Sequence, residues 1–145
     1  MNNKIKMIFP NKSCNERLAR SVVSAFVLDL DPTAEQLAEL KTAVSEAVTN
    51  AIIHGYKEDP DGIVELECSV KHNRKVVIVV RDWGCGIEDI EKAREPMFTT
   101  GADDERSGMG FTVMESFMDR VEVKSEAGKG TAVTMTKQLD ICNEQ

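Results

Sequence analysis

The chain has 145 residues, of which 41% are hydrophobic and 30% charged, so it has the length of one globular domain, and its composition excludes a disordered or fibrous chain. Lys and Arg number 18 against 25 Asp and Glu, which gives a formal net charge of −7. This charge repels nucleic-acid backbones and anionic lipids, so we expect no direct binding to nucleic acid or membrane and favour a basic protein partner.

The N-terminal residues predict a strand followed by a helix. Residues 4–9 alternate polar and apolar side chains as a short strand does, and Pro10 ends the pattern. Ser13 and Glu16 have the spacing of a capping box, which predicts a helix from there to about Leu28. We expect this helix to bury a stripe of apolar residues, namely Leu18, Val22, Ala25 and Phe26.

A second, longer helix is predicted after the break at residues 31–32. Thr33 and Gln36 have the spacing of another capping box, and the helical pattern continues to His54. Gly55 then occupies the position at which helices commonly end.

The rest of the chain predicts strands, a loop and one more helix. Residues 95–107 have neither a helical nor a strand period and predict a mobile loop, and residues 108–118 predict a helix. The pattern lacks a βαβ rhythm, so we expect an α+β fold: a two-layer sandwich with a mixed, mostly antiparallel sheet, formed as one domain by residues 1–145. The further predicted strands are residues 63–71, 75–81, 120–125 and 131–138.

The cysteines and the apolar runs bear on the cellular compartment. Cys14, Cys68, Cys85 and Cys142 lie far apart with no C-x-x-C pair, so no zinc ribbon or thioredoxin-type motif is present. We interpret them as reduced, mostly buried thiols. No apolar run reaches the roughly 18–20 residues of a membrane span, and the N-terminus lacks the apolar region of a signal peptide, so we expect a cytoplasmic protein.

Glu46 and Asn50 lie four residues apart on the long predicted helix and therefore share one side of it. Their neighbours are almost all apolar or small. For a single helix the more common explanation is a solvated face. The alternative is a functional pair that faces a pocket.

Asp82 ends a predicted strand and is followed by Gly84 and Gly86. This pattern is typical of a simple turn. It also fits a site where glycines let a planar ligand approach the backbone while the carboxylate accepts a hydrogen bond from an amino group, such as that of adenine. Trp83 between them either stacks on a ligand or, more commonly, packs on the surface.

Gly108, Met109 and Gly110 open the last predicted helix. A helix N-terminus presents unpaired N–H groups and a positive dipole end, both of which favour phosphate binding. The motif is not a Walker loop, because no Gly-Lys-Ser/Thr follows, and it is not a dinucleotide fingerprint, because no βαβ unit precedes it. Residues 128–131, Gly-Lys-Gly-Thr, are better explained as a hairpin turn than as a ligand contact when taken alone.

Together and in this order, these features resemble the boxes of the Bergerat ATP-binding fold, which gyrase, Hsp90, histidine-kinase and MutL ATPase domains share. They are Glu-x-x-x-Asn on a helix, Asp-x-Gly-x-Gly after a strand, a Gly-x-Gly helix start after a loop, and a final Gly-Thr. Within this fold, residues 4–136 are similar to the anti-sigma-F factors of spore-forming bacteria, which are serine protein kinases. The similarity is carried by the segments SEAVTNAIIHGY, VRDWGCGI, EPMFTT and ERSGMGFTVMESFMD.

The resemblance implies roles for individual residues. Glu46 would act as general base or orienter for an attacking serine hydroxyl, and Asn50 would bind Mg²⁺ together with phosphate oxygens. Asp82 would recognise the amino group of adenine, and residues 99–107 would form a lid over the ATP. The other implied nucleotide contacts are Gly84, Gly86, Thr99, Thr100, Arg106, Ser107, Gly108, Met109, Gly110 and Thr131.

The chain departs from the family pattern in this lid. Lids of the family often place a Lys or Arg over the terminal phosphate, but Thr100 is followed here by Gly-Ala-Asp-Asp-Glu. Mg²⁺ and Arg106 would then have to neutralise the phosphate charge, and we expect slow turnover.

The resemblance also implies protein partners. The chain would form a homodimer that binds and inhibits a sporulation sigma factor, sigma-F, in the ATP-bound state and phosphorylates its anti-anti-sigma factor on serine. Glu16, Arg17 and Arg20 of the first predicted helix are candidates for partner contact, or else a solvated face. Three alternatives stay open: an anti-sigma kinase of the general-stress sigma factor, a non-catalytic ATP-gated binding module, and a detached histidine-kinase catalytic domain.

Overall fold

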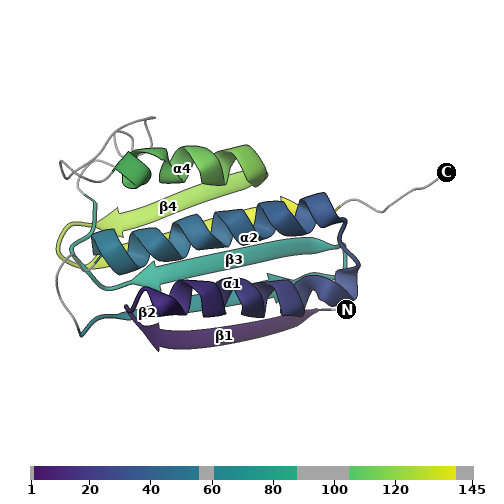
Figure 1. Ribbon diagram of the computed structural model, residues 1–145, viewed down its shortest axis with the longest axis horizontal. Coiled ribbons are helices and arrows are strands. Elements are labelled where there is room, and N and C mark those ends of the chain that lie inside the picture. Colours follow the sequence, from purple (N-terminus) through teal and green to yellow (C-terminus); the bar gives the residue numbers. More distant parts are fainter. Residues whose placement is uncertain (1, 56–60, 88–104, 140–145) are drawn as a thin grey trace.

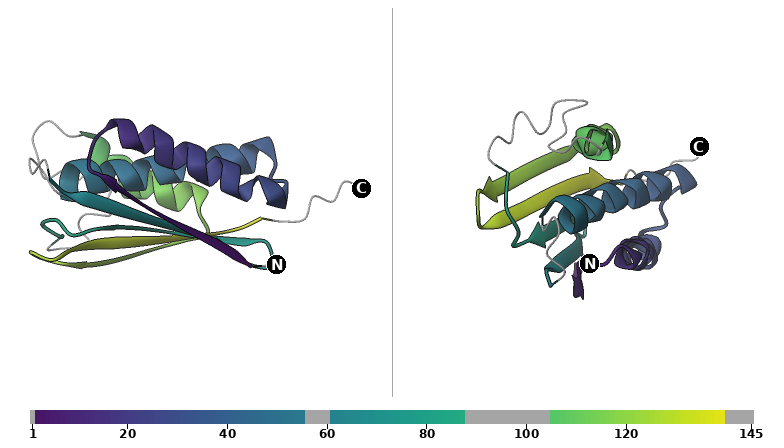
Figure 2. Two further views of the ribbon diagram at one scale, coloured as in Figure 1. Left: turned by 90° about the horizontal axis from the view of Figure 1, so that it is seen from below. Right: turned by 60° about the vertical axis from the view of Figure 1, so that its left-hand side comes forward.

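The computed structural model describes residues 2–55, 61–87 and 105–139 (Figure 1). The helices form one layer on one face of a five-stranded sheet with the strand order β1-β2-β3-β5-β4 (Figure 2). Every pairing in this sheet is antiparallel. The expected α+β two-layer sandwich is therefore confirmed, but the sheet formed by the described strands is antiparallel and not mixed.

The strands match their predicted positions to within one or two residues at each end. Along β3, residues 76, 78, 80 and 82 are buried on the helix side, while the residues between them are half-buried on the other face, as the period of two requires. The strands are β1 (Asn3–Pro10), β2 (Ile63–Val70), β3 (Lys75–Asp82), β4 (Arg120–Glu126) and β5 (Gly130–Gln138).

The first helix, α1 (Cys14–Val27), continues into a 3-10 turn, η1 (Leu28–Leu30). The predicted capping box at Ser13 and Glu16 is wrong, because Ser13 already has helical backbone angles and its side chain makes no capping hydrogen bond. The predicted apolar stripe is wrong for Leu18, which is 51% exposed, and for Ala25, which is also exposed, whereas Phe26 is partly buried and packs against the core. The face of α1 that packs onto the core is shifted by one residue and consists of Ala19, Val23 and Val27.

The second helix, α2 (Ala34–Thr49), begins with the predicted capping box. Thr33 Oγ1 accepts the Gln36 N–H at 3.0 Å, and Gln36 Oε1 accepts the Thr33 N–H at 2.9 Å. The helix lies between α1 and α4 (Figure 1) and buries a row of apolar residues against the sheet. It does not run on as an α-helix to His54, because residues Asn50–Gly55 form a π-helical turn, η2. Such turns are rare and often occur at functional sites.

The last helix, α4 (Glu105–Phe117), starts three residues earlier than predicted. Gly108 and Gly110 therefore lie inside its first two turns, and residues 105–107 belong to the helix and not to a loop. Lys137 of β5, which is only 8% exposed, holds the other end of α4. Its Nζ lies 2.7 Å from the carbonyl oxygen of Phe117 and 2.8 Å from Oε1 of Glu39 on α2.

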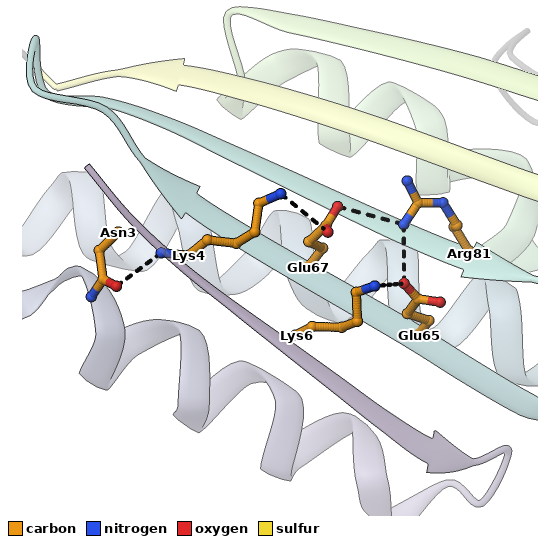
Figure 3. Close-up of polar contacts among 6 residues, drawn as sticks. All are labelled: Asn3, Lys4, Lys6, Glu65, Glu67 and Arg81. Atoms are coloured by element: carbon orange, nitrogen blue, oxygen red, sulfur yellow. Dashed lines mark hydrogen bonds and ion pairs between the residues drawn. The ribbon is translucent and has the colours of Figure 1, made fainter.

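The sheet face that the helices do not cover carries a ladder of charges across β1, β2 and β3 (Figure 3). Lys4 pairs with Glu67 at 3.5 Å, and Lys6 pairs with Glu65 at 3.4 Å. Arg81 Nη1 lies 3.3 Å from Glu65 and 3.6 Å from Glu67, so it joins both pairs into one network. Among these residues, no two like charges lie directly opposite each other on neighbouring strands, and this favours the observed register.

The cysteines differ in exposure. Cys14 and Cys85 are exposed, so the expectation of mostly buried thiols is wrong for these two. Cys68 is buried, and this burial raises the pKa of its thiol to about 12. Cys142 lies outside the described residues. In the described part of the chain no helix is long and apolar enough to cross a membrane.

Candidate functional site

Three segments far apart in the sequence meet at one end of the sheet: the π-helical turn after α2, the loop after β3, and the turn between β4 and β5. The carbonyl oxygen of Gly55 accepts the Cys85 N–H at 2.7 Å, and the Cys85 carbonyl accepts the Gly128 N–H at 2.6 Å. The loop after β3 is thereby fixed on both sides by backbone hydrogen bonds. This end of the sheet contains Asp82, Gly84, Gly86 and Thr131 of the predicted site.

Asp82 lies at the end of β3 and is 7% exposed. Its Oδ1 accepts the Gly84 N–H at 3.0 Å. Thr131 is the residue of β5 directly opposite Asp82, and its backbone also hydrogen-bonds the carboxylate. Burial raises the pKa of Asp82 from 3.8 to about 6, although these two hydrogen bonds act in the opposite direction. A buried carboxylate with lone pairs to spare at the end of a strand suits a ligand that brings a hydrogen-bond donor.

The glycines around Asp82 are required by close backbone packing. A Cβ on Gly84 would lie 1.6 Å from the Gly55 carbonyl oxygen, and one on Gly130 would lie 2.2 Å from that of Asp82. Gly86 has φ +77°, and a Cβ there would meet the Glu126 carbonyl oxygen at 2.2 Å. These glycines therefore let the three segments touch, and a direct contact of Gly84 or Gly86 with a nucleotide stays a prediction.

Ser125, at the end of β4, is a residue of this site that the sequence analysis did not identify. Its Oγ accepts the Ile87 N–H at 2.7 Å, donates to the Gly130 carbonyl oxygen at 2.9 Å, and lies 2.8 Å from Thr131 Oγ1. The register of the predicted hairpin, in which Ser125 faces Thr131, is the signal that could have found it.

Glu46 lies in the last turn of α2, and Asn50 follows directly after this helix. Asn50 begins the π-helical turn, and its N–H is shared between the carbonyl oxygens of Glu46 and Ala47. A Cβ on Gly110 of α4 would lie 2.9 Å from Asn50 Nδ2, so the Asn50 side chain lies directly against α4. Glu46 and Asn50 are both half-buried, so neither residue is fully exposed to solvent or part of the buried core.

Within the described residues, no group of three or more His, Cys, Asp and Glu could hold a metal ion. Asn50 offers one amide oxygen, which alone is too few ligands for a divalent cation. A magnesium ion bound mainly by phosphate oxygens and water needs only one or two protein ligands, so the residues present fit Mg²⁺ that arrives with a nucleotide.

Several predicted nucleotide contacts are described only in part. Thr99 and Thr100 lie outside the described residues, as do residues 101–104. The backbone of Arg106, Ser107 and Met109 belongs to α4. Because α4 begins at Glu105, the predicted Gly-x-Gly segment does not form its N-terminus, and phosphate binding at this end of the helix stays a prediction.

The predicted partner-contact residues lie on α1. Glu16 is less exposed than expected, with 20% of its side chain accessible, and its Oε2 lies 3.1 Å from Arg20 Nε. Arg17 is exposed. An i,i+4 ion pair of this kind contributes about 0.3–0.5 kcal/mol to helix stability, so the pair has a structural role whether or not a partner binds there.

A hollow of about 350 Å³ lies near Asp82 at the ends of β3, β4 and β5. It is lined by Arg81, Trp83 and Lys124, among others, and Trp83 is 51% exposed. Its lining comes from both faces of the sheet, with Asp82, Ser125 and Thr131 on the helix side and Arg81, Lys124 and Ala132 on the opposite face. The hollow therefore adjoins the side chains of Asp82 and Thr131, and its lining does not include Asn50.

Comparisons with known proteins agree with this arrangement. Residues 9–137 match the family model of the histidine kinase-like ATPase domain. An anti-sigma F factor of Geobacillus stearothermophilus is 56% identical over 100% of this chain and 97% of its own. An anti-sigma F factor of a Thermoanaerobacter species is 56% identical over 94% of both chains.

Two solved structures show the same fold at low sequence identity. A crystal structure of the RsbU and RsbW domains of a Mycobacterium tuberculosis protein aligns with 94% of this chain and with 32% of the solved chain. The TM-score of this alignment is 0.67, and the sequence identity is 19%. The histidine kinase domain of a blue-light activated kinase from Erythrobacter litoralis covers 83% of this chain and 59% of its own, with a TM-score of 0.56 at 20% identity. From the family model and these full-length relatives, the chain belongs to the histidine kinase-like ATPase family and, within it, to the anti-sigma F factors.

Proposed function

We propose that this protein is an ATP-dependent anti-sigma factor that binds and inhibits a sporulation sigma factor, sigma-F, and phosphorylates the corresponding anti-anti-sigma factor on serine. The observation that carries the proposal is the 56% identity, over nearly the whole chain, to relatives named anti-sigma F factor. An ATPase domain model over residues 9–137 supports ATP as the nucleotide.

The site geometry supports adenine recognition at Asp82. Its carboxylate is buried beside Thr131 and retains acceptor capacity after the hydrogen bond from the Gly84 N–H. An exocyclic amino group supplies the donor that such a carboxylate needs. The phosphates would then lie toward Asn50 and the N-terminal turn of α4, to which Arg106 and Ser107 belong.

The proposed reaction needs one base and a set of positioned charges. The serine oxygen of the protein substrate attacks the terminal phosphorus of ATP, the bond from that phosphorus to the ADP oxygen breaks, and Glu46 accepts the serine proton or orients the hydroxyl. Asn50 would hold Mg²⁺, which supplies charge neutralisation when it is bound with the nucleotide. Phosphoryl transfer depends mostly on positioning and charge, so these few residues suffice.

We further propose that the protein works as a cytoplasmic homodimer and contacts its partners through Arg17, Glu16 and Arg20 on α1. Arg17 is exposed, whereas Glu16 and Arg20 are half-buried and pair with each other on the same helix. A sigma factor carries basic surfaces that bind nucleic acid, and the net charge of −7 on this chain has the complementary sign.

The test is phosphoryl transfer to a candidate anti-anti-sigma protein with Mg²⁺ and γ-labelled ATP. Wild type is compared with Glu46→Gln and with Glu35→Gln, a matched control on an exposed position of the same helix. We expect acid-stable label on the partner with wild type and Glu35→Gln, and its loss with Glu46→Gln.

Other outcomes distinguish the alternatives. Bound ATP without any label on the partner would overturn the kinase and leave an ATP-gated binding module. Acid-labile label would indicate a phosphorylated histidine and therefore a histidine-kinase catalytic domain. Inhibition of a general-stress sigma factor in preference to sigma-F would overturn the assignment of the partner.

A further inference from the structure

The hydroxyl group of Ser125 lies at the centre of three polar contacts on the helix side of the sheet. The Ile87 N–H lies 2.7 Å from its Oγ, the Gly130 carbonyl oxygen 2.9 Å away, and Thr131 Oγ1 2.8 Å away. Ser125 and Thr131 are direct partners in the β4–β5 register, so their side chains project from the same face. Ser125 is half-buried and has no role among the predicted nucleotide contacts.

Counting hydrogens fixes the direction of each of these hydrogen bonds. A serine hydroxyl has one hydrogen to donate and two lone pairs that accept. The Gly130 carbonyl can only accept, so it takes the Ser125 hydrogen, and the Ile87 N–H takes one lone pair. The contact with Thr131 therefore uses the second lone pair, which makes Thr131 the donor. Thr131 Oγ1 then has only acceptor capacity left for a ligand.

Thr131 lies beside a second group that can only accept. It is the direct partner of Asp82 in the β3–β5 register, and its backbone hydrogen-bonds the Asp82 carboxylate. An ionised carboxylate has no hydrogen to donate. Two adjacent side chains therefore present acceptors alone at this end of the candidate site.

We infer that Ser125 is a positioning residue that makes Thr131 an acceptor and thereby strengthens the preference of the site for 6-aminopurines over 6-oxopurines. The inference rests on the proposed function, which places a purine at Asp82. An exocyclic amino group donates to both acceptors, whereas a 6-oxo group would bring a third acceptor against them. An unmatched buried acceptor loses its hydrogen bond to water without replacement, which is the physical source of the discrimination.

The test compares the affinity of the protein for ATP and for inosine triphosphate, which share their sugar and phosphates and differ at the purine 6-position and in the hydrogen that inosine carries on N1. Calorimetry gives the ratio of the two dissociation constants for wild type, Ser125→Ala and Ser125→Thr. We expect wild type to favour ATP, and Ser125→Ala to reduce that preference about five- to tenfold, because the Thr131 hydroxyl can then turn its hydrogen toward the ligand. Ser125→Thr retains the hydroxyl and should keep the ratio within about twofold of wild type.

A second pair of variants covers the case in which Ser125→Ala does not fold. Thr131→Val removes the acceptor and should reduce the preference for ATP, while Thr131→Ser keeps it. In the Thr131→Val background, adding Ser125→Ala should change the ratio no further, because the group on which Ser125 acts is already absent.

The results separate the inference from the proposed function. A wild-type preference for ATP that a folded Ser125→Ala leaves unchanged, or that Thr131→Val leaves unchanged, overturns the role of Ser125 while ATP binding stands. A wild-type protein that binds neither nucleotide overturns the proposed function and this inference with it.

Discussion

The side chain of Asn50 lies so close to Gly110 that a Cβ on the glycine would be 2.9 Å from Asn50 Nδ2. The contact joins the π-helical turn after α2 to the second turn of α4. A glycine inside a helix costs about 1 kcal/mol relative to alanine, so its presence in α4 needs a reason. The space that Asn50 occupies supplies that reason.

The first prediction concerns Gly110→Ala. The new methyl group meets the end of a flexible side chain, so we expect Asn50 to rotate while the fold is retained, and the melting temperature to stay the same or rise slightly. Because Asn50 is the proposed Mg²⁺ ligand, affinity for Mg²⁺ with ATP should fall about tenfold or more. Calorimetry and thermal unfolding measure the two effects separately. Ser116→Ala, at an exposed position of the same helix, is the control.

The second prediction contrasts two glycines. Gly84→Ala places a Cβ 1.6 Å from the Gly55 carbonyl oxygen, which is backbone and cannot move aside, so we expect a loss of about 3 kcal/mol or more in the free energy of unfolding. Gly128→Ala has nothing within 4 Å of its Cβ and bears only the strain of φ +83°. That strain costs about 1–2 kcal/mol. Urea unfolding measures both, and equal losses would contradict the packing argument.

The third prediction follows from the pKa of Asp82, which burial raises to about 6. The folded state holds this proton more tightly than the unfolded chain does. This contribution to stability is therefore present at low pH and is lost as pH rises toward and through 6. Replacement by Asn should stabilise the unliganded protein at pH 7 by about 2 kcal/mol and flatten the pH dependence between 4 and 7.

Adenosine binding should show the opposite pH dependence. The ionised Asp82 is the better acceptor for an amino group, so affinity should increase as pH rises through about 6. Adenosine is the suitable probe because it has no phosphate that titrates in this range. An affinity that is independent of pH between 5 and 7.5, with the folded protein present throughout, would contradict the proposed contact.

The sheet and the second helix were predictable because their sequence signals are local. Alternation along residues 75–82 and the capping box at Thr33 each determine an element from a few neighbouring residues. Ser13 has the same spacing to Glu16, but Ser13 is already helical and Glu16 pairs with Arg20, so the spacing alone could not identify a cap. Which face of α1 is buried depends on the sheet beneath it, which the helix sequence does not encode.

The candidate site was predictable as a set of boxes but not as a set of contacts. The order of the motifs brought Asp82, Asn50 and Thr131 into one proposed site. Two features could not be predicted from the sequence because they depend on long-range packing. They are the π-helical turn that follows α2 and the contact of the Ser125 hydroxyl with Thr131. Likewise, Gly110 has a described contact with Asn50, which no spacing within residues 105–117 could indicate.

The last prediction concerns Lys137, which connects α2, α4 and β5. Its Nζ is 2.8 Å from Glu39 and 2.7 Å from the last carbonyl of α4, and its side chain is 10% exposed. Lys137→Met leaves the Glu39 carboxylate without its cation in a partly buried place, so we expect a loss of about 2–3 kcal/mol in the free energy of unfolding. Lys129→Met is the control, because the Lys129–Glu126 pair is exposed and should be worth less than about 1 kcal/mol.

A double variant shows whether the loss comes from the uncompensated charge. Adding Glu39→Leu to Lys137→Met removes both charges and should recover at least half of the lost stability, because apolar packing can replace a buried ion pair. Lys137 also donates a hydrogen bond to the Phe117 carbonyl oxygen, and both the single and the double variant lack this hydrogen bond. A double variant less stable than Lys137→Met would show that Glu39 stabilises α2 independently of Lys137, and that an uncompensated charge is not the cause of the loss.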